Sequence, residues 1–454
     1  MDRSIFRMYD VRGVAGAGLD ESTVFMLGRE LSRRAGGEGA RMAVGRDCRP
    51  SGGQLFEWLA RGICSTGASV IDLGVQTTPM TYFACYALDD PEATVMITGS
   101  HNPPEYNGFK MMLGRHTLYG PEIAGLADSM EDSWTEPFGE AHADRVDLYD
   151  RYTDRLVSEF CLGRPLRVVV DGGNGTGGGV ACDVLGRLGC EVVPIFCEMD
   201  GSFPNHHPDP TVPSNLRDLR WLVLSEKADL GVAYDGDADR LGVVDERGEI
   251  VWGDRVLILL ARALLRSYPG AVVISEVKAS RLFFSEVEKA GGRPLMSATG
   301  HSIIKKNMIE QNALLAGEMS GHVFFRDRYY GYDDALYATL RLLEVLSDGE
   351  EPLSRRLSDL PEVVSTPEIR EACPEEQKAA LVDRVRRRLS DRGYEVDTTD
   401  GVRIEFPDGW GLLRASNTQP VLVMRFEASS RERLDEYERI VRETLAQASE
   451  EEPG

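Results

Sequence analysis

The stretch Ala93-Thr-Val-Met-Ile-Thr-Gly-Ser-His-Asn-Pro-Pro-Glu-Tyr-Asn-Gly-Phe-Lys-Met-Met-Leu113 places a polar loop between two apolar, strand-like runs. The loop holds Ser100 between Gly and His, on a turn fixed by Asn102-Pro-Pro104. Such a turn suits a hydroxyl that is held out for covalent chemistry. Taken alone, an ordinary Ser-Asn-Pro turn without chemistry is the better interpretation. Two further loops change that balance.

The second loop, Asp235-Gly-Asp-Ala-Asp-Arg240, also lies between two strand-like runs. Its alternating carboxylates can converge on one hard cation that prefers oxygen ligands. An EF-hand fits poorly, because Arg240 occupies the position that requires Gly and the flanks are typical of strands. An aspartyl nucleophile of the haloacid-dehalogenase type is an alternative for Asp235, but Asp239 stands where that pattern has Thr or Val. A solvated acidic turn needs no such density of carboxylates between buried strands, so metal binding is favoured.

Two more loops follow the same plan. Gly317-Glu-Met-Ser-Gly-His322 offers an acceptor, a hydroxyl and an imidazole to a polyhydroxylated ligand, or else forms a self-satisfied polar turn. Arg414-Ala-Ser-Asn-Thr-Gln-Pro420 offers a forked cation, hydroxyls and an amide. This second loop is equally consistent with a cradle for a phosphate dianion and with an ordinary Ser-Asn-Thr turn.

The first three loops belong to a longer unit that occurs three times. Each unit begins with a strand, near residues 42, 166 and 271, and continues through a helix that ends at a Gly, the usual C-terminal signal. A second strand, the loop with its two flanking strands and a further helix complete the unit. The predicted helices span 54–65, 179–188 and 282–289 within the units, and 121–130, 253–265 and 334–346 after the loops. Three related α/β domains with mixed sheets are the economical explanation.

The pattern changes after about residue 366. A charged helix (374–389), strands near 402–406 and beside the Arg414 loop, and a closing helix (431–446) predict a smaller α+β C-terminal domain. We therefore expect four domains around a central active-site cleft. The expected domains span 1–150, 151–252, 253–365 and 366–454, and the chain length of 454 residues is comfortable for four domains of about 100 residues each.

Composition restricts the class of function. The chain is 42% hydrophobic and 28% charged, as expected of a soluble globular protein. No apolar run approaches ~18 residues, and Met1-Asp-Arg-Ser-Ile-Phe-Arg7 has no apolar signal region, so neither a membrane span nor secretion is expected. The net charge of −23 argues against nucleic acid as a partner. The eight cysteines include no CxxC pair and predict free thiols in a reducing cytoplasm, not disulfides or zinc.

Together these loops resemble the α-D-phosphohexomutase superfamily, and within it the prokaryotic phosphomannomutase/phosphoglucomutase branch. The match runs in the family's order over nearly the whole chain. The matching segments are 6–13, 98–110, 171–176, 203–210, 235–240, 299–302, 317–322, 330–334 and 414–420. Gly99 and Met319 favour this branch, since phosphoglucosamine mutases typically carry Ala and Gln there. Gln419 is a departure, because many relatives have Glu at that position.

The resemblance implies reversible phosphoryl transfer between C1 and C6 of hexose phosphates, those of mannose and also those of glucose. Ser100 would be carried as a phosphoserine, and a hexose 1,6-bisphosphate would be both intermediate and activator. The implied metal is Mg²⁺, held by Asp235, Asp237, Asp239 and a phosphate oxygen on Ser100. The partners expected are small hexose phosphates, with no nucleic acid and no membrane. We expect a cytoplasmic monomer, with a dimer as the alternative.

The resemblance also implies roles for the remaining site residues. His101, Lys110, Arg240, Arg12 and His301 would stabilise charge or transfer protons near the phosphoryl group. Substrate binding would involve Tyr9, Lys278, Glu318, Ser320, His322, Arg414, Ser416, Asn417 and Thr418. His206 and His207, between two prolines, are assigned to a structural loop and not to the site.

Three rival functions fit parts of the pattern. A phosphoglucosamine mutase would keep the fold and change the substrate. A metal-dependent sugar phosphatase would use the aspartates and leave Ser100 unmodified. A non-catalytic sugar-phosphate binding protein is least favoured, because every loop keeps its reactive group. Fold alone does not decide among these functions; the loops do.

Overall fold

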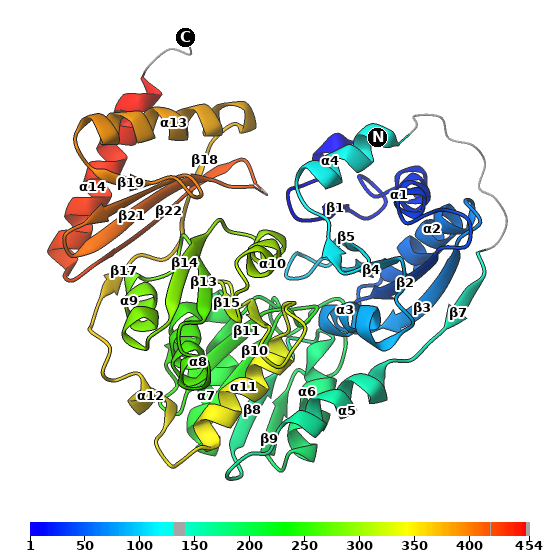
Figure 1. Ribbon diagram of the computed structural model, residues 1–454, viewed down its shortest axis with the longest axis horizontal. Coiled ribbons are helices and arrows are strands. Elements are labelled where there is room, and N and C mark those ends of the chain that lie inside the picture. Colours follow the sequence, from blue (N-terminus) through cyan, green and yellow to red (C-terminus); the bar gives the residue numbers. More distant parts are fainter. Residues whose placement is uncertain (131–140, 418, 451–454) are drawn as a thin grey trace.

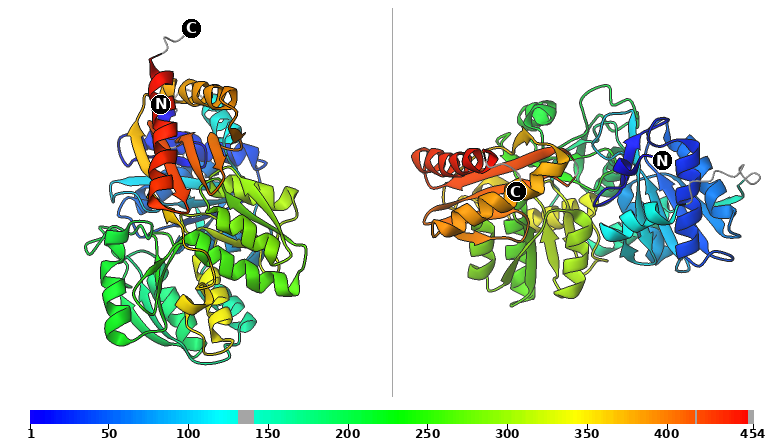
Figure 2. Two further views of the ribbon diagram at one scale, coloured as in Figure 1. Left: turned by 90° about the vertical axis from the view of Figure 1, so that its left-hand side faces the viewer. Right: turned by 90° about the horizontal axis from the view of Figure 1, so that it is seen from above.

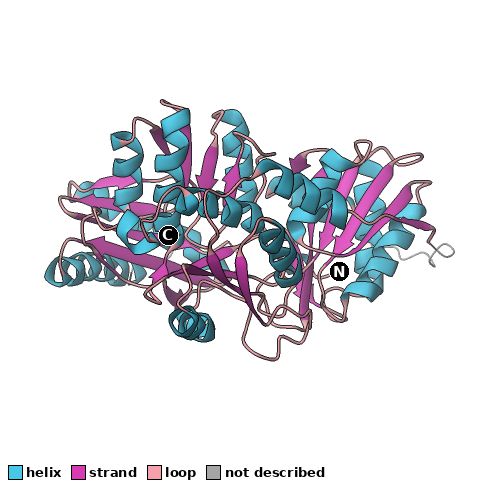
Figure 3. Cartoon of the chain, turned by 90° about the horizontal axis from the view of Figure 1, so that it is seen from below, coloured by secondary structure: helices cyan, strands magenta, loops and turns pink. Residues whose placement is uncertain are grey.

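The computed structural model describes residues 1–130, 141–417 and 419–450. These residues form four sheets with their helices, one after another along the chain (Figure 1). The first and last sheets stand at opposite ends of the molecule, as the view from above also shows (Figure 2), and the two middle sheets lie between and below them. Helices flank the strands of each sheet (Figure 3). No helix in these ranges is both long and apolar enough to span a bilayer.

The first domain contains a seven-stranded sheet. Its elements are η1 (Arg3–Ile5), β1 (Val11–Val14), α1 (Glu21–Arg34), β2 (Arg41–Arg46), α2 (Gly52–Cys64), β3 (Ser69–Val75), α3 (Thr78–Ala87), β4 (Ala93–Ile97), β5 (Tyr106–Leu113), β6 (His116–Thr117), α4 (Pro121–Ser129) and β7 (Ala143–Arg145). The strand order is β1-β5-β4-β2-β3-β7, and β6 pairs with β5.

The second and third domains contain sheets of five and four strands. The second comprises α5 (Tyr149–Glu159), β8 (Arg167–Asp171), α6 (Gly177–Arg187), β9 (Glu191–Ile195), η2 (Pro213–Leu216), α7 (Arg217–Glu226), β10 (Leu230–Tyr234), β11 (Leu241–Asp245) and β12 (Ile250–Val251). The third comprises α8 (Gly253–Ser267), β13 (Val272–Glu276), α9 (Arg281–Lys289), β14 (Arg293–Ser297), α10 (His301–Glu310), β15 (Leu315–Gly317), β16 (Val323–Phe325), α11 (Ala335–Ser347) and α12 (Leu353–Arg356).

These three sheets share one topology, which confirms the internal repeat. In each, a central strand is parallel to two neighbours, and a fourth strand returns antiparallel beside one of them. The equivalent strand orders are β3-β2-β4-β5, β9-β8-β10-β11 and β14-β13-β15-β16. The glycines predicted to close the first helix of each unit, Gly67, Gly189 and Gly291, have φ of +85°, +83° and +80°. This left-handed conformation is the one that glycine adopts without strain.

The fourth domain is an antiparallel sheet covered by two helices. Its elements are β17 (Val364–Ser365), β18 (Ile369–Ala372), α13 (Glu375–Asp391), β19 (Glu395–Asp397), β20 (Val402–Phe406), β21 (Gly409–Ala415), β22 (Val421–Ala428) and α14 (Arg431–Ser449). Helices α13 and α14 contact each other and the same strands. The fold class is therefore three related α/β domains with mixed sheets and a smaller α+β domain.

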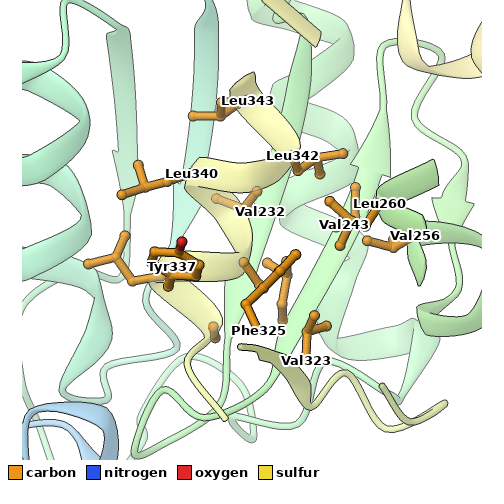
Figure 4. Close-up of a cluster of buried hydrophobic side chains, with 14 of the residues drawn as sticks. Val232, Val243, Val256, Leu260, Val323, Phe325, Tyr337, Leu340, Leu342 and Leu343 are labelled. Carbon is orange, nitrogen blue, oxygen red and sulfur yellow. The ribbon is translucent and has the colours of Figure 1, made fainter. Parts of the chain in front are cut away.

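One apolar core spans the first three domains. Leu340, Leu342 and Leu343 of α11 belong to this core, and Leu342 points toward Val243 of β11 and Leu260 of α8 (Figure 4). The fourth domain joins the third through a smaller contact, in which the Arg403 guanidinium lies over the ring of the fully buried Trp410 and donates to two carbonyls of the third domain. The first three domains are thus joined by a shared apolar core, and the fourth domain is joined to the third by this polar contact.

Candidate active site

Each of the four loops singled out in the sequence joins two antiparallel strands. The serine loop (98–105) follows β4, the aspartate loop (235–240) follows β10, and the glutamate loop (318–322) follows β15. The arginine loop (414–420) joins β21 to β22 in the fourth domain. In the three repeated domains the loop leaves the carboxyl end of a parallel strand, the usual position of ligand sites in such sheets.

Ser100 is buried and points toward the aspartate loop. Its Oγ donates to Asp235 Oδ2 at 2.7 Å and lies 3.1 Å from His101 Nδ1. The residue has a φ of +50°, a conformation that costs a non-glycine residue about 1–2 kcal/mol. The two loops touch through their backbones, because a Cβ atom added at Gly236 would lie 2.5 Å from the Ser100 carbonyl oxygen.

Arg49, which the sequence interpretation missed, holds the serine loop in place. Its buried guanidinium donates to the carbonyl oxygens of Ser100 at 2.8 Å, Asn102 at 2.6 Å, Pro103 at 2.5 Å and Tyr106 at 3.0 Å. The Asp47 carboxylate beside it accepts from Arg49 and from Thr98, whose hydroxyl in turn accepts from the Ser100 N–H. A polar turn after β2 was the only signal of this role in the sequence.

The three carboxylates of the aspartate loop are completely buried and lie together. Lys110 Nζ donates to Asp237 Oδ2 at 2.7 Å and to Asp239 Oδ2. The other oxygens of these two residues, Asp237 Oδ1 and Asp239 Oδ1, are buried without a hydrogen-bond partner among the described residues. Buried oxygens without partners, on three clustered carboxylates, fit a bound divalent cation.

Electrostatics supports the same assignment. Burial, together with the charges of Asp237 and Asp239, raises the pKa of Asp235 well above its usual value. Burial also opposes ionisation of Asp237, but the adjacent Lys110 charge prevails and lowers its pKa. Burial disfavours the charged form of Lys110, yet Asp237 and Asp239 raise its pKa well above normal. The Lys110 ammonium and the Arg240 guanidinium, which lies 3.9 Å from Asp235, face three carboxylates. With all three ionised one negative charge remains, which a cation would offset.

Three histidines lie near these loops. Arg240 Nε donates to His322 Nε2 at 3.0 Å, so the His322 proton is on Nδ1, which lies 3.1 Å from Asp333 Oδ2. His301 stacks on His322 with ring centroids 5.5 Å apart. Loss of hydration lowers the pKa of His301 well below its usual value, and the same effect lowers that of His101. Both imidazoles are therefore neutral near pH 7.

The glutamate loop contributes a buried carboxyl group. Glu318 accepts a hydrogen bond from the Gly300 N–H at 2.8 Å, and burial raises its pKa. Ser320 is half-buried, and its hydroxyl has no hydrogen bond to another described residue. Lys278 Nζ lies 3.5 Å from Glu276 and 3.3 Å from Glu368. Burial lowers the pKa of Lys278, but the charges of Glu276, Glu368 and Glu318 outweigh it and raise the pKa above its usual value.

The arginine loop offers donors to an anion. Arg414 is buried, and its Nε donates to Asp400 at 2.9 Å, while its Nη2 has no partner among the described residues. Asn417 Nδ2 donates to Tyr9 Oη at 2.5 Å, and Tyr9 Oη donates to the Thr299 carbonyl at 2.5 Å. Tyr9 thus connects the first, third and fourth domains.

The remaining predicted residues have the following positions. Ser416 is buried beside Arg414, and Thr418 lies outside the described residues. Arg12 donates to Asp10 at 2.5 Å, and its Nε is buried without a partner within the ranges described. His206 lies 3.0 Å from Asp171 and supports the loop after β8. Lys378 of α13, which the sequence interpretation missed, donates to the backbone carbonyls of the arginine loop.

Comparison with known proteins gives one consistent picture. Models of the phosphoglucomutase/phosphomannomutase alpha/beta/alpha domains I, II and III and of the C-terminal domain match residues 3–133, 150–248, 252–364 and 368–444. The chain is 44% identical to the phosphomannomutase/phosphoglucomutase of Pseudomonas aeruginosa over 97% of this chain and 95% of that protein. It is 46% identical to the phosphoglucomutase of Neisseria gonorrhoeae, with 94% of each chain covered. The crystal structure of a phosphoglucomutase/phosphomannomutase family protein from Burkholderia thailandensis has a TM-score of 0.91 and 44% identity, and the match covers 100% of this chain and 99% of that one.

Proposed function

Because the chain belongs to the phosphoglucomutase/phosphomannomutase family and is a phosphohexomutase, we propose that Ser100 carries the phosphoryl group that this isomerase moves. The reaction interconverts the 1- and 6-phosphates of a hexose, and we infer that both mannose and glucose phosphates are substrates. The observation that carries the assignment is the 2.7 Å hydrogen bond from Ser100 Oγ to Asp235, inside a buried carboxylate cluster with unpartnered oxygens.

The family depends on a metal ion, and we propose that Mg²⁺ is that ion here. Asp235, Asp237 and Asp239 offer only oxygen ligands, which Mg²⁺ prefers, and an oxygen of the phosphorylated Ser100 would add another. When bound, the cation supplies charge neutralisation at the phosphoryl group.

The side chains around Ser100 suit transfer in two halves. In the first, the bond from phosphorus to Ser100 Oγ breaks, a bond to a sugar hydroxyl oxygen forms, and the hydroxyl proton passes to a base. The neutral His101, whose Nδ1 lies 3.1 Å from Ser100 Oγ, is the candidate for this base. Lys110 and Arg240 offset the charge of the phosphoryl group. In the second half, the hexose 1,6-bisphosphate reorients. The bond from its other phosphorus to the sugar oxygen breaks, a bond from that phosphorus to Ser100 Oγ forms, and the base returns the proton to the sugar oxygen.

We propose that the third and fourth domains hold the sugar phosphate. Glu318 and Ser320 would bond sugar hydroxyls that glucose and mannose have in common, since these two sugars differ only at C2. Arg414 would hold the phosphate that is not reacting, because its Nη2 is a buried, charged donor without a partner in the described part of the chain. The same proposal assigns substrate contacts to Tyr9, Lys278, Ser416, Asn417 and Thr418, and places Arg12 and His301 near the reacting groups.

We also propose the domain boundaries, the cellular location and the oligomeric state of the protein. Domain boundaries at 1–150, 151–252, 253–365 and 366–454 are supported by the pairing of β7 with β3 in the first sheet and by the start of α8 at Gly253. Two elements begin slightly before these boundaries: α5 starts at Tyr149, and β17 (Val364–Ser365) pairs with β22 of the fourth sheet. A cytoplasmic location is supported by the free state of all eight cysteines. We propose a monomer as the active unit.

The phosphoserine proposal can be tested by mass and by turnover. Intact-mass and phosphopeptide analysis of the purified protein should find an increment of about 80 Da on Ser100. Ser100→Ala should lower mutase turnover by orders of magnitude and leave the circular dichroism spectrum unchanged. Release of inorganic phosphate from mannose 1-phosphate at the rate of its consumption would instead identify a phosphatase. Faster turnover of glucosamine 6-phosphate than of the mannose and glucose phosphates would identify the related mutase.

The metal proposal has its own test. Treatment with EDTA should abolish activity, and Mg²⁺ should restore it. Asp237→Asn should weaken Mg²⁺ binding, measured by calorimetry, and lower turnover at subsaturating Mg²⁺. Full activity after EDTA treatment would show that the aspartate loop does not hold the working metal.

A further inference from the structure

Two cysteines that lie 15 residues apart in sequence meet in the second domain. Cys182 of α6 donates a hydrogen bond to Cys197, which follows β9, and their sulfur atoms are 3.7 Å apart. Both thiols are free and half-buried. The other six cysteines form no hydrogen bond to a cysteine sulfur in the described part of the chain, so this pair is a distinct feature.

The packing of α6 brings the two thiols together. A Cβ atom added at Gly178 would lie 2.7 Å from the Cys197 Cα atom, so glycine allows the helix to approach the chain after β9. Cys182 is one helical turn after Gly178 and therefore on the same face. Cys197 Sγ also donates to the carbonyls of Val170 at 3.4 Å and Ile195 at 3.3 Å, which fixes its position beside β8.

We propose that Cys182 and Cys197 are a redox pair that forms an intramolecular disulfide when the folded protein meets a small-molecule disulfide such as oxidised glutathione. Their sulfur atoms are already in contact, so disulfide formation needs only a small movement of the side chains. This modification site is separate from the mutase site, because the hydrogen bonds of the two thiols within the described residues go to each other and to the carbonyls of Val170 and Ile195, none of which belongs to the four loops.

The two thiols have different roles in the exchange. When Cys182 is a thiolate it accepts a hydrogen bond from the Cys197 thiol, which lowers the pKa of Cys182; the same bond, with burial, raises the pKa of Cys197. The Cys182 thiolate attacks one sulfur of oxidised glutathione, which breaks the glutathione disulfide and releases one glutathione thiolate. Cys197 then loses its proton to solvent and attacks the Cys182 sulfur, which releases the second glutathione. Two protein thiols are oxidised and one glutathione disulfide is reduced.

The disulfide would restrain the segment before Cys197, which is linked by hydrogen bonds to the aspartate loop. Asn174 N–H donates to the Phe196 carbonyl at 2.8 Å, and Thr176 N–H donates to the Gly236 carbonyl at 3.0 Å. The segment before Cys197 is therefore linked through residues 174–176 to the loop that holds the carboxylates. Closing the chain between Cys182 and Cys197 also restricts the unfolded state, which raises stability.

Peptide mapping of the native protein tests this inference. After incubation with oxidised glutathione and alkylation of the remaining thiols, a peptide linking Cys182 to Cys197 should appear, with a loss of about 2 Da for the two thiol hydrogens. The melting temperature should rise, and dithiothreitol should reverse both changes. Absence of the linked peptide, or its appearance only after denaturation, would overturn the proposal.

Single substitutions separate the two roles. Cys197→Ser should accumulate a mixed disulfide with glutathione on Cys182, because the resolving thiol is absent. Cys182→Ser should leave Cys197 unmodified under the same conditions. Cys190→Ser, a half-buried cysteine of the same domain, should form the linked peptide like the parent protein. Modification of Cys197 in the Cys182→Ser variant at the rate seen for Cys182 would contradict the proposed order of attack.

Discussion

Asp334 shows how a single buried carboxyl group can couple stability to pH. Its Oδ2 accepts hydrogen bonds from Tyr329 at 2.7 Å and Tyr152 at 2.8 Å, and its Oδ1 caps α11 by accepting from the Tyr337 N–H at 2.9 Å. Burial raises its pKa to about 6, although these three bonds oppose the shift. A carboxyl whose pKa is higher in the folded than in the unfolded protein binds its proton more tightly when folded.

We therefore expect the Asp334 contribution to the free energy of unfolding to decline as pH rises from about 4 to about 6. The shift of about two pKa units corresponds to about 3 kcal/mol. Asp334→Asn keeps an acceptor for the helix cap and has no charge. The melting temperature of this variant should therefore increase relative to that of the parent protein as pH rises. Calorimetry from pH 4 to pH 8 checks this, with the exposed Asp348→Asn as control. A constant difference across this range would contradict the prediction.

At the scale of secondary-structure elements, helix α13 anchors the backbone of the arginine loop, and this anchoring should affect the affinity for the substrate phosphate. Lys378 of α13 is buried and donates to the carbonyls of Ser416 and Gln419, so the helix fixes the shape of the arginine loop. Arg414 itself is held by Asp400. The donors proposed to bind the distant phosphate are therefore arranged before substrate arrives, which lowers the entropic cost of binding.

Lys378→Met keeps the aliphatic stem and removes the charged donor. A hydrogen bond of a charged group is worth about 1.5–3 kcal/mol, so we expect kcat/KM to fall about 10- to 150-fold. The loss should be mainly in KM, because the loop holds a phosphate that does not react. Steady-state kinetics with glucose 1-phosphate checks the split. The exposed Arg387→Met on the same helix should be neutral, and a fall in kcat without a change in KM would contradict this role.

The sequence predicted the strand–loop–strand units better than the contacts beneath them. Runs such as 230–234 and 402–406 coincide with β10 and β20, because short apolar runs between turn residues have few other ways to be buried. The sequence analysis did not predict helices α1, α3, α5, α7, α10 and α12, since the repeat was recognised from its strands and glycines. Arg49 and Lys378 were missed because they act on backbone carbonyls, which no side-chain pattern marks. The meeting of Cys182 and Cys197 depends on how α6 packs, which spacing alone does not reveal.

At the scale of the whole molecule, positive charge is concentrated where the net charge of −23 would otherwise repel an anion. Four of the seven lysines, Lys110, Lys278, Lys305 and Lys378, are buried, and all four lie beside the site loops or the residues that support them. Three of them lie beside carboxylates: Lys110 at Asp237 and Asp239, Lys278 at Glu276 and Glu368, and Lys305 at Asp333. They therefore offset negative charge at the site, which lowers the repulsion that a sugar phosphate meets there.

A substitution at Tyr9 tests whether the contacts between domains contribute to substrate binding. Its hydroxyl group accepts from Asn417 and donates to the Thr299 carbonyl, so it joins three domains. Tyr9→Phe removes both bonds, each worth about 0.5–1.5 kcal/mol, and should raise the KM for sugar phosphate about 5- to 150-fold. Hexose 1,6-bisphosphate should also escape into solution more often during turnover, which isotope-labelled substrate would reveal. Tyr268→Phe is the exposed control, and unchanged escape in Tyr9→Phe would contradict this role.

The contact between Gly236 and the Ser100 carbonyl has a consequence for gene recombination. A chimera that takes its first domain from one parent and the remaining domains from another preserves this contact only if both parents keep the two loops at the same separation. Any side chain at position 236 would meet the Ser100 backbone, because the added Cβ atom would lie 2.5 Å from the carbonyl oxygen. A shuffled library should therefore retain glycine at this position as strictly as it retains the carboxylates, although glycine itself takes no part in the chemistry.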